Sequence, residues 1–136
     1  MIDKEIIKIA SNTENHGVLN NHTHFSKLKN AICGDEMKIY LIVQNDVVKN
    51  FKYECESCIY CQASVSLLSR KAKDKPIRKI KVFAEEAKNS FEKDIKSFDK
   101  EWKEFDKIMT KNNISRKECL LLPIKTTIDA INKKNL

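Results

Sequence analysis

One stretch of regular alternation restricts the fold of this chain more than any other feature. Apolar side chains occupy every second position in residues 36–43, which is the period of a half-buried β-strand. Gln44-Asn45-Asp46 then predicts a turn, and residues 47–55 read as a second strand. The outer ends of two antiparallel strands meet, so we expect Cys33, just before the first strand, to lie near Cys58, just after the second. The predicted inward faces carry Met37, Ile39, Leu41 and Val43 in the first strand, and Val47, Phe51, Tyr53 and Cys55 in the second.

Most of the remaining chain has helical periodicity. We expect a short amphipathic helix over 2–10, an edge strand over 24–31, and a helix over 61–73 that ends at Lys73-Asp74-Lys75-Pro76. The next stretch is helical with one apolar stripe, although its periodicity does not decide between one helix and two helices broken near Ser97. The stripe consists of Ile80, Ala84, Ala87, Phe91, Ile95, Phe98, Trp102, Phe105 and Met109.

Two further helices are predicted near the C-terminus. Ser115 is a suitable N-cap for a short helix that carries Cys119, and Pro123 can begin the last helix. With no internal repeat and no low-complexity linker, residues 1–136 are predicted to form a single domain. The predicted class is α+β, with a small antiparallel sheet of about three strands packed against several α-helices.

Composition excludes several classes of function. The net charge of +7 comes mainly from lysines scattered among acidic residues, without the basic patch and interleaved aromatics typical of nucleic-acid binding. No apolar run approaches the roughly 20 residues that span a bilayer, and the N-terminus lacks an apolar signal core. We therefore expect a cytoplasmic protein that binds neither nucleic acid nor membrane. Its five cysteines, an odd number, argue against a disulfide scaffold and favour metal or sulfur chemistry.

Four residues have the chemistry of a metal site. Cys33, Asp35, Cys58 and Cys119 offer three thiolates and one carboxylate, a set that suits tetrahedral zinc or an iron–sulfur cluster with one labile ligand. Gly34 permits a tight turn between Cys33 and Asp35.

Two more thiols complete a C-x2-C-x2-C pattern around Cys58. Cys55 and Cys61 are predicted either as accessory thiols at the edge of the site or as small packing residues. The pattern is not that of a bacterial ferredoxin, because the C-x3-C-P continuation and a second set of cysteines are missing.

Three motifs together resemble a known family. They are Cys-Gly-Asp before an alternating strand, Cys-x-x-x-x-Ala-Ser-x-Ser at a strand-to-helix bend, and a late Cys-x-Leu-Leu-Pro. Their order and spacing resemble the iron–sulfur cluster assembly scaffolds of the NifU N-terminal/IscU type. The resemblance implies that Cys33, Asp35, Cys58 and Cys119 are the ligands of zinc or of a labile cluster.

Within this family the chain looks more similar to the SufU branch. About 60 residues separate Cys58 from Cys119, and Arg116 lies three positions before Cys119, where it could stabilise a thiolate. The resemblance implies a SufS-like cysteine desulfurase as sulfur donor and Suf-type components or apo iron–sulfur proteins as further partners. The SufU likeness implies Cys33 as the persulfide acceptor, and the IscU likeness implies Cys119. The chain departs from the family in having Ser57 before the middle cysteine, where glycine is usual.

Three functions remain open from the sequence. The first is a scaffold that receives sulfur from the desulfurase and builds or relays a labile cluster. The second is a zinc-dependent sulfur acceptor, or sulfurtransferase, whose freed thiolate attacks the donor. The third is a zinc-stabilised interaction module, for which Cys33→Ser would lose stability together with function.

Overall fold

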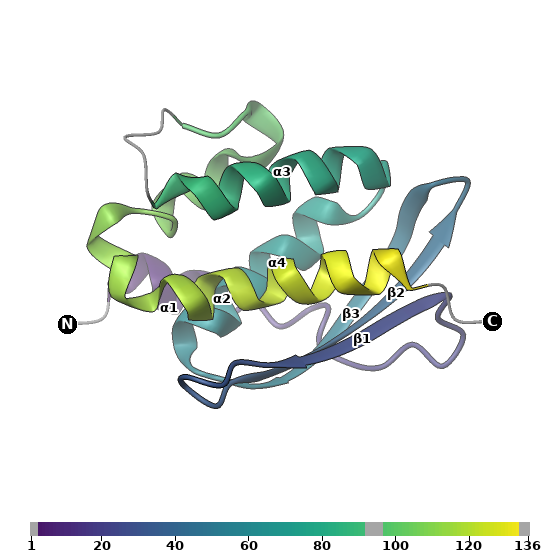
Figure 1. The fold of residues 1–136 in the computed structure, drawn as a ribbon, viewed down its shortest axis with the longest axis horizontal. Coiled ribbons are helices and arrows are strands. Elements are labelled where there is room, and N and C mark those ends of the chain that lie inside the picture. The colour runs from purple at the N-terminus through teal and green to yellow at the C-terminus, as the bar shows by residue number, and fades with distance from the viewer. Residues whose placement is uncertain (1–2, 92–96, 134–136) are drawn as a thin grey trace.

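The computed structural model describes residues 3–91 and 97–133, which form a three-stranded antiparallel sheet with helices gathered over one of its faces (Figure 1). The predicted α+β class and the number of strands are therefore confirmed. The elements in chain order are α1 (Lys4–Ala10), β1 (His24–Lys29), β2 (Glu36–Gln44), β3 (Val47–Glu56), α2 (Ile59–Ala72), α3 (Ile77–Ser90), the 3₁₀ segments η1 (Lys100–Lys107) and η2 (Lys111–Arg116), and α4 (Lys117–Asn132).

The predicted hairpin is β2 and β3, with β2 in the middle of the sheet. Asn45 and Asp46 connect the strands with φ angles of 53° and 61°, the left-handed pair that a type I′ turn requires. A β-bulge interrupts the expected alternation. Val43 of β2 pairs with Val48 of β3, whereas the preceding residue, Ile42, pairs with Asn50. The extra residue moves Val48 to the core face, where it is fully buried. The predicted inward face of the second strand is therefore wrong at Val47 and correct at Phe51 and Tyr53.

Helix α2 fills the centre of the molecule. It contacts β3 and packs against α1 and α4, and its residues from Ala63 to Ser69 are all buried. Small side chains allow this close approach, and their hydroxyls are satisfied by backbone carbonyls. Ser64 donates to the carbonyl of Leu120 in α4 at 2.6 Å, and Ser66 donates to the carbonyl of Asn12 at 2.6 Å. These two bonds fix α2 relative to α4 and to the segment that follows α1.

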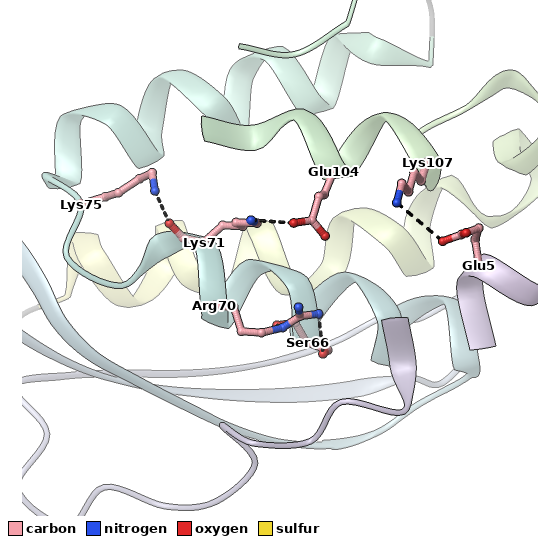
Figure 2. A network of polar contacts seen from close by, with 7 residues as sticks. All are labelled: Glu5, Ser66, Arg70, Lys71, Lys75, Glu104 and Lys107. Atoms are coloured by element: carbon pink, nitrogen blue, oxygen red, sulfur yellow. Dashed lines mark hydrogen bonds and ion pairs between the residues drawn. The ribbon is translucent and has the colours of Figure 1, made fainter. Parts of the chain in front are cut away.

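Several lysines are engaged in ion pairs between elements (Figure 2). Lys71 of α2 pairs with Glu104 of η1 at 2.7 Å, and Lys107 of η1 pairs with Glu5 of α1 at 3.8 Å. The bond from Lys71 lowers the pKa of the Glu104 carboxyl, although exposed pairs of this kind contribute at most about 1 kcal/mol each. Within the described residues, every helix is too short or too polar to cross a lipid bilayer.

An aromatic cluster joins α3 to η1. The ring of Phe83 stacks on Trp102 at 4.2 Å between centroids and contacts Phe105 and Phe98 at 4.7 and 5.3 Å. The predicted apolar stripe is interrupted, because α3 ends at Ser90 and η1 begins at Lys100. The stripe nevertheless faces the core, with Ala84 half-buried and the other described members buried. Ile95 lies outside the described residues.

The C-terminal helix differs from the prediction. Cys119 and Pro123 belong to one continuous helix, α4, which is preceded by η2 and has Arg116 rather than Ser115 at its N-cap position. Pro123 lies inside the helix and has no N–H to donate to the carbonyl of Cys119. The helix continues through Pro123 because tertiary packing outweighs the missing hydrogen bond: residues 119–124 are all buried.

Removing the Trp102 side chain should test how far the aromatic cluster supports the fold. Because Trp102 is buried and stacked on Phe83, Trp102→Ala is expected to lower the free energy of unfolding by about 3–5 kcal/mol. Urea unfolding followed by circular dichroism measures this change. Val82→Ala, at an exposed position beside Phe83, is the control and should change stability by less than about 0.5 kcal/mol. A loss below about 1 kcal/mol for Trp102→Ala would show that the cluster is dispensable.

Candidate metal centre

Three of the predicted ligands converge at one end of the sheet. Ligand atoms of Cys33, Asp35 and Cys119 all lie within 4.8 Å of one another, and the sulfurs of Cys33 and Cys119 are 3.6 Å apart. In the described part of the chain this is the one group of three metal-binding side chains with such spacing. The structure thus brings together residues that are 86 positions apart in the sequence.

The loop between β1 and β2 sets the position of Cys33 and Asp35. Asn30 closes this loop: its carbonyl accepts from the Gly34 N–H at 2.7 Å, and its N–H donates to the Asp35 carbonyl at 2.7 Å. Gly34 has a φ of +77°, a left-handed conformation that glycine adopts without strain. A Cβ at Gly34 would meet no atom within 4 Å, so backbone conformation, and not lack of space, accounts for the glycine. The turn leaves Cys33 exposed and Asp35 buried.

Cys58 approaches the same site from the start of α2. It occupies the N-cap position of α2, and its backbone N–H donates to Asp35 Oδ1 at 3.2 Å. Cys58 is not a member of the group within 4.8 Å, but it still contributes to raising the pKa of the Cys119 thiol. All four predicted ligands are therefore neighbours, with Cys58 at a greater distance than the other three.

Cys119 is held in the first turn of α4 and is almost fully buried. Burial is the main cause that raises the pKa of the Cys119 thiol, and the groups of Cys58, Cys33 and Asp35 raise it further. A metal ion that bound here would have to displace the proton from this thiol, because the thiolate is the ligand.

The carboxylate of Asp35 supports a cation at this position. Asp35 Oδ2 is buried and has no hydrogen-bond partner within residues 3–91 and 97–133, whereas Oδ1 accepts the bond from Cys58. Burying an unpaired carboxylate oxygen is unfavourable unless a positive charge compensates it. Three thiols and one such carboxylate form the four-ligand set that zinc or an iron–sulfur cluster accepts, so the residues fit these groups.

Arg116 lies beside the site, on an aromatic ring. Its guanidinium carbon is 5.2 Å from the centroid of the Tyr60 ring, in the first turn of α2. This cation–π contact links the start of α4 to the start of α2. The predicted role of Arg116 as a thiolate stabiliser stays a prediction. Tyr60 was missed from the sequence, since an isolated tyrosine in a helix carries no signal for such a contact.

The two candidate accessory thiols, Cys55 and Cys61, are not members of the group within 4.8 Å. Burial raises the pKa of both thiols, and charges on Asp35 and Cys58 add to the effect. Cys61 is fully buried and Cys55 is half-buried. Ser57, which the sequence singled out only as a departure from the family pattern, has a buried hydroxyl with no hydrogen-bond partner among the described residues, and this side chain partly offsets the effect of burial on the pKa of both thiols.

Comparison with known proteins identifies relatives over the whole chain. Residues 1–105 match the family described as the NifU-like N-terminal domain. The chain is 31% identical over 133 residues to the iron–sulfur cluster assembly scaffold protein IscU of Thermotoga maritima, covering 98% of this chain and 94% of the relative. It is 33% identical over 66 residues to the zinc-dependent sulfurtransferase SufU of Bacillus subtilis, which covers 48% of this chain and 44% of the relative.

Solved structures share the fold. A NifU-like N-terminal protein from Brucella abortus superposes with a TM-score of 0.89 at 20% identity, covering 96% of this chain and 91% of the other. A candidate SUF-system scaffold protein from Fervidobacterium islandicum superposes with a TM-score of 0.87 at 24% identity, covering 96% of each chain. Together with the family match and the IscU relative, these findings show that the chain belongs to the NifU-like N-terminal domain family, which includes iron–sulfur cluster assembly scaffold proteins.

Proposed function

We propose that the chain is a scaffold on which iron–sulfur clusters are assembled, with Cys33, Asp35, Cys58 and Cys119 as ligands. The observation that carries this proposal is the convergence of two thiols with a buried, partly unpaired carboxylate, and with Cys58 beside them. Relatives that include an IscU scaffold protein support it. Three thiolates bind iron strongly and one carboxylate binds it less strongly, so a cluster held here is more readily released than one held by four thiolates.

Cys33 is the proposed acceptor of sulfur. It is exposed whereas Cys119 is buried, so a donor protein reaches the Cys33 sulfur first. The proposed donor is a cysteine desulfurase of the SufS type. The Cys33 thiolate attacks the outer sulfur of the donor's persulfide, a new S–S bond forms on Cys33, and the donor cysteine leaves as a thiolate. Each transferred sulfur then needs two electrons to become sulfide, so assembly requires an electron donor together with ferrous iron.

Arg116 and the recipients of the finished cluster also have proposed roles in this reaction. Arg116 lies at the start of the helix that carries Cys119, and its positive charge would favour thiolates at the site. The proposed recipients of the finished cluster are apo iron–sulfur proteins or other Suf-type components, and the proposed location is the cytoplasm.

A zinc-dependent sulfur acceptor is the second candidate function. The mixed set of thiols and carboxylate fits zinc as well as iron, and the match to a zinc-dependent SufU supports this alternative over about half of the chain. Bound zinc would supply positive charge that keeps its thiol ligands deprotonated. Cys33 then receives the sulfur in the same way, and no cluster is built.

Anaerobic purification separates the candidates. Iron with matching acid-labile sulfide, and transfer of the cluster to an apo-ferredoxin, is expected for the scaffold. One zinc per chain with faster turnover of a desulfurase would favour the sulfur acceptor. Zinc without any effect on a desulfurase would favour the interaction module and contradict both other functions.

Replacement of Cys33 tests the acceptor role. Metal-free Cys33→Ser is expected to gain no persulfide from a desulfurase and to remain folded, because Cys33 lies exposed in a loop. Mass spectrometry of the intact chain detects the added sulfur, and circular dichroism monitors the fold. Val82→Ser, at an exposed position of α3, should accept sulfur normally. Zinc-loaded Cys33→Ser protein that is much less stable than the zinc-loaded wild type would support the interaction module instead, and normal sulfur loading would exclude Cys33 as the acceptor.

Asp35→Asn should have opposite effects on the apo-protein and on metal binding. Asparagine can still accept the bond from Cys58 but removes the buried charge, so the free energy of unfolding of the apo-protein should rise by about 1 kcal/mol. Zinc affinity should fall at least about 10-fold, since a charged ligand is lost. Thermal unfolding with and without zinc measures both changes. A less stable apo-protein with unchanged zinc affinity would remove Asp35 from the ligand set.

A further inference from the structure

The sulfurs of Cys33 and Cys119 are neighbours with different access to solvent. They lie 3.6 Å apart, which places them in direct contact. Cys33 is exposed in the loop before β2, whereas Cys119 is only 4% exposed in the first turn of α4. A donor protein therefore reaches the Cys33 sulfur from the solvent side, and the Cys119 sulfur touches it from the side of the core.

Packing holds Cys119 in place, while Cys33 has room to move. Residues 119–124 of α4 are all buried, and the carbonyl of Leu120 accepts a hydrogen bond from Ser64 of α2 at 2.6 Å. Cys33 lies in an exposed loop, where a change of its rotamer moves the sulfur without disturbing the core. An S–S bond of about 2.05 Å is about 1.5 Å shorter than the present separation of 3.6 Å, so a small movement of Cys33 suffices to bond the two sulfurs.

We propose that Cys119 releases the sulfur that Cys33 has accepted, in the form of sulfide. This inference rests on the proposed role of Cys33 as sulfur acceptor and concerns the step that follows it. The Cys119 sulfur attacks Cys33 Sγ, and the bond between Cys33 Sγ and the outer sulfur of the persulfide breaks. The outer sulfur leaves as hydrosulfide, which carries the thiol proton of Cys119, and a Cys33–Cys119 disulfide remains. The outer sulfur gains the two electrons that the two cysteines lose.

The different access of the two sulfurs selects the inner sulfur of the persulfide as the point of attack. The outer sulfur arrives from a donor on the exposed side, so it extends from Cys33 away from Cys119. Thiol exchange proceeds along the axis of the S–S bond that breaks, and a thiol behind Cys33 Sγ meets this requirement. Attack on the outer sulfur would only move the persulfide to Cys119 and would yield no sulfide.

The other three cysteines are less suited to this step. The group of ligand atoms within 4.8 Å contains the sulfurs of Cys33 and Cys119 but none from Cys55, Cys58 or Cys61. Burial raises the pKa of the Cys119 thiol and favours its neutral form, so sulfide release should be slower than sulfur uptake. Each release consumes both thiols, and a dithiol reductant must reopen the site before a metal binds.

A single round of sulfur transfer tests this role. Metal-free protein, prepared by chelation without oxygen or added thiols, is mixed with a desulfurase that already carries its persulfide and has been freed of cysteine. Wild-type protein is expected first to gain one sulfur and then to release it as sulfide, which the methylene blue assay measures. Peptide mapping after alkylation of free thiols should find a Cys33–Cys119 disulfide in an amount equal to the sulfide.

Serine variants assign the step to Cys119. Cys119→Ser should keep the persulfide on Cys33 and release no sulfide, with circular dichroism to check its fold. Cys55→Ser replaces a half-buried cysteine outside the converging group, and this matched control should release sulfide as the wild type does. Sulfide release by folded Cys119→Ser at the wild-type rate would overturn the inference. The peptide map of the wild type needs no variant, and a disulfide or persulfide there that does not join Cys33 to Cys119 would overturn it as well.

Failure of this inference is distinguishable from failure of the proposed function. A persulfide that persists on Cys33 of the wild type without sulfide release would overturn the role of Cys119 and leave Cys33 as the acceptor. Wild-type protein that gains no sulfur and releases no sulfide would contradict both.

Discussion

The site depends on the hydrogen bond from the Cys58 N–H to Asp35 Oδ1. It joins the turn before β2 to the first residues of α2, and these two segments supply three of the four proposed ligands. The carboxylate also lies at the N-terminus of a 14-residue helix, where a negative charge is favoured by the helix dipole.

The same carboxylate shows that stability and function make different demands on the site. Its second oxygen is buried and has no partner in the part of the chain that the structure describes, which is unfavourable in the metal-free protein. Its neighbour Cys119 is buried as well, and burial favours the neutral thiol. A bound cation would remove both disadvantages, because it compensates the charge of the Asp35 carboxylate and stabilises the Cys119 thiolate. These features are expected of the proposed ligand set and not of a piece of hydrophobic core optimised for stability.

The sequence was sufficient for the hairpin and for the approximate location of the site, because alternation and turn residues are local signals. It was insufficient at Val47, where one extra residue in a bulge reverses the face, and at Pro123, where burial maintains a helix that local preference would end. The contact between Arg116 and Tyr60 could not be predicted, since it depends on how two distant helices are docked. Assignment to the SufU branch stays a prediction, because the relatives include both an IscU and a SufU protein.

The separation of Cys33 from Cys119 by 86 positions has a consequence for biosynthesis. A ribosome releases the hairpin and α2 well before it completes α4, so a growing chain has Cys33, Asp35 and Cys58 but lacks Cys119, the fourth proposed ligand. A metal bound across the finished site closes a long loop, which constrains the chain in the same way as a cross-link. For the proposed scaffold, loading would thereby be coupled to completion of the fold, and a truncated or unfolded chain would be a poor competitor for iron and sulfur.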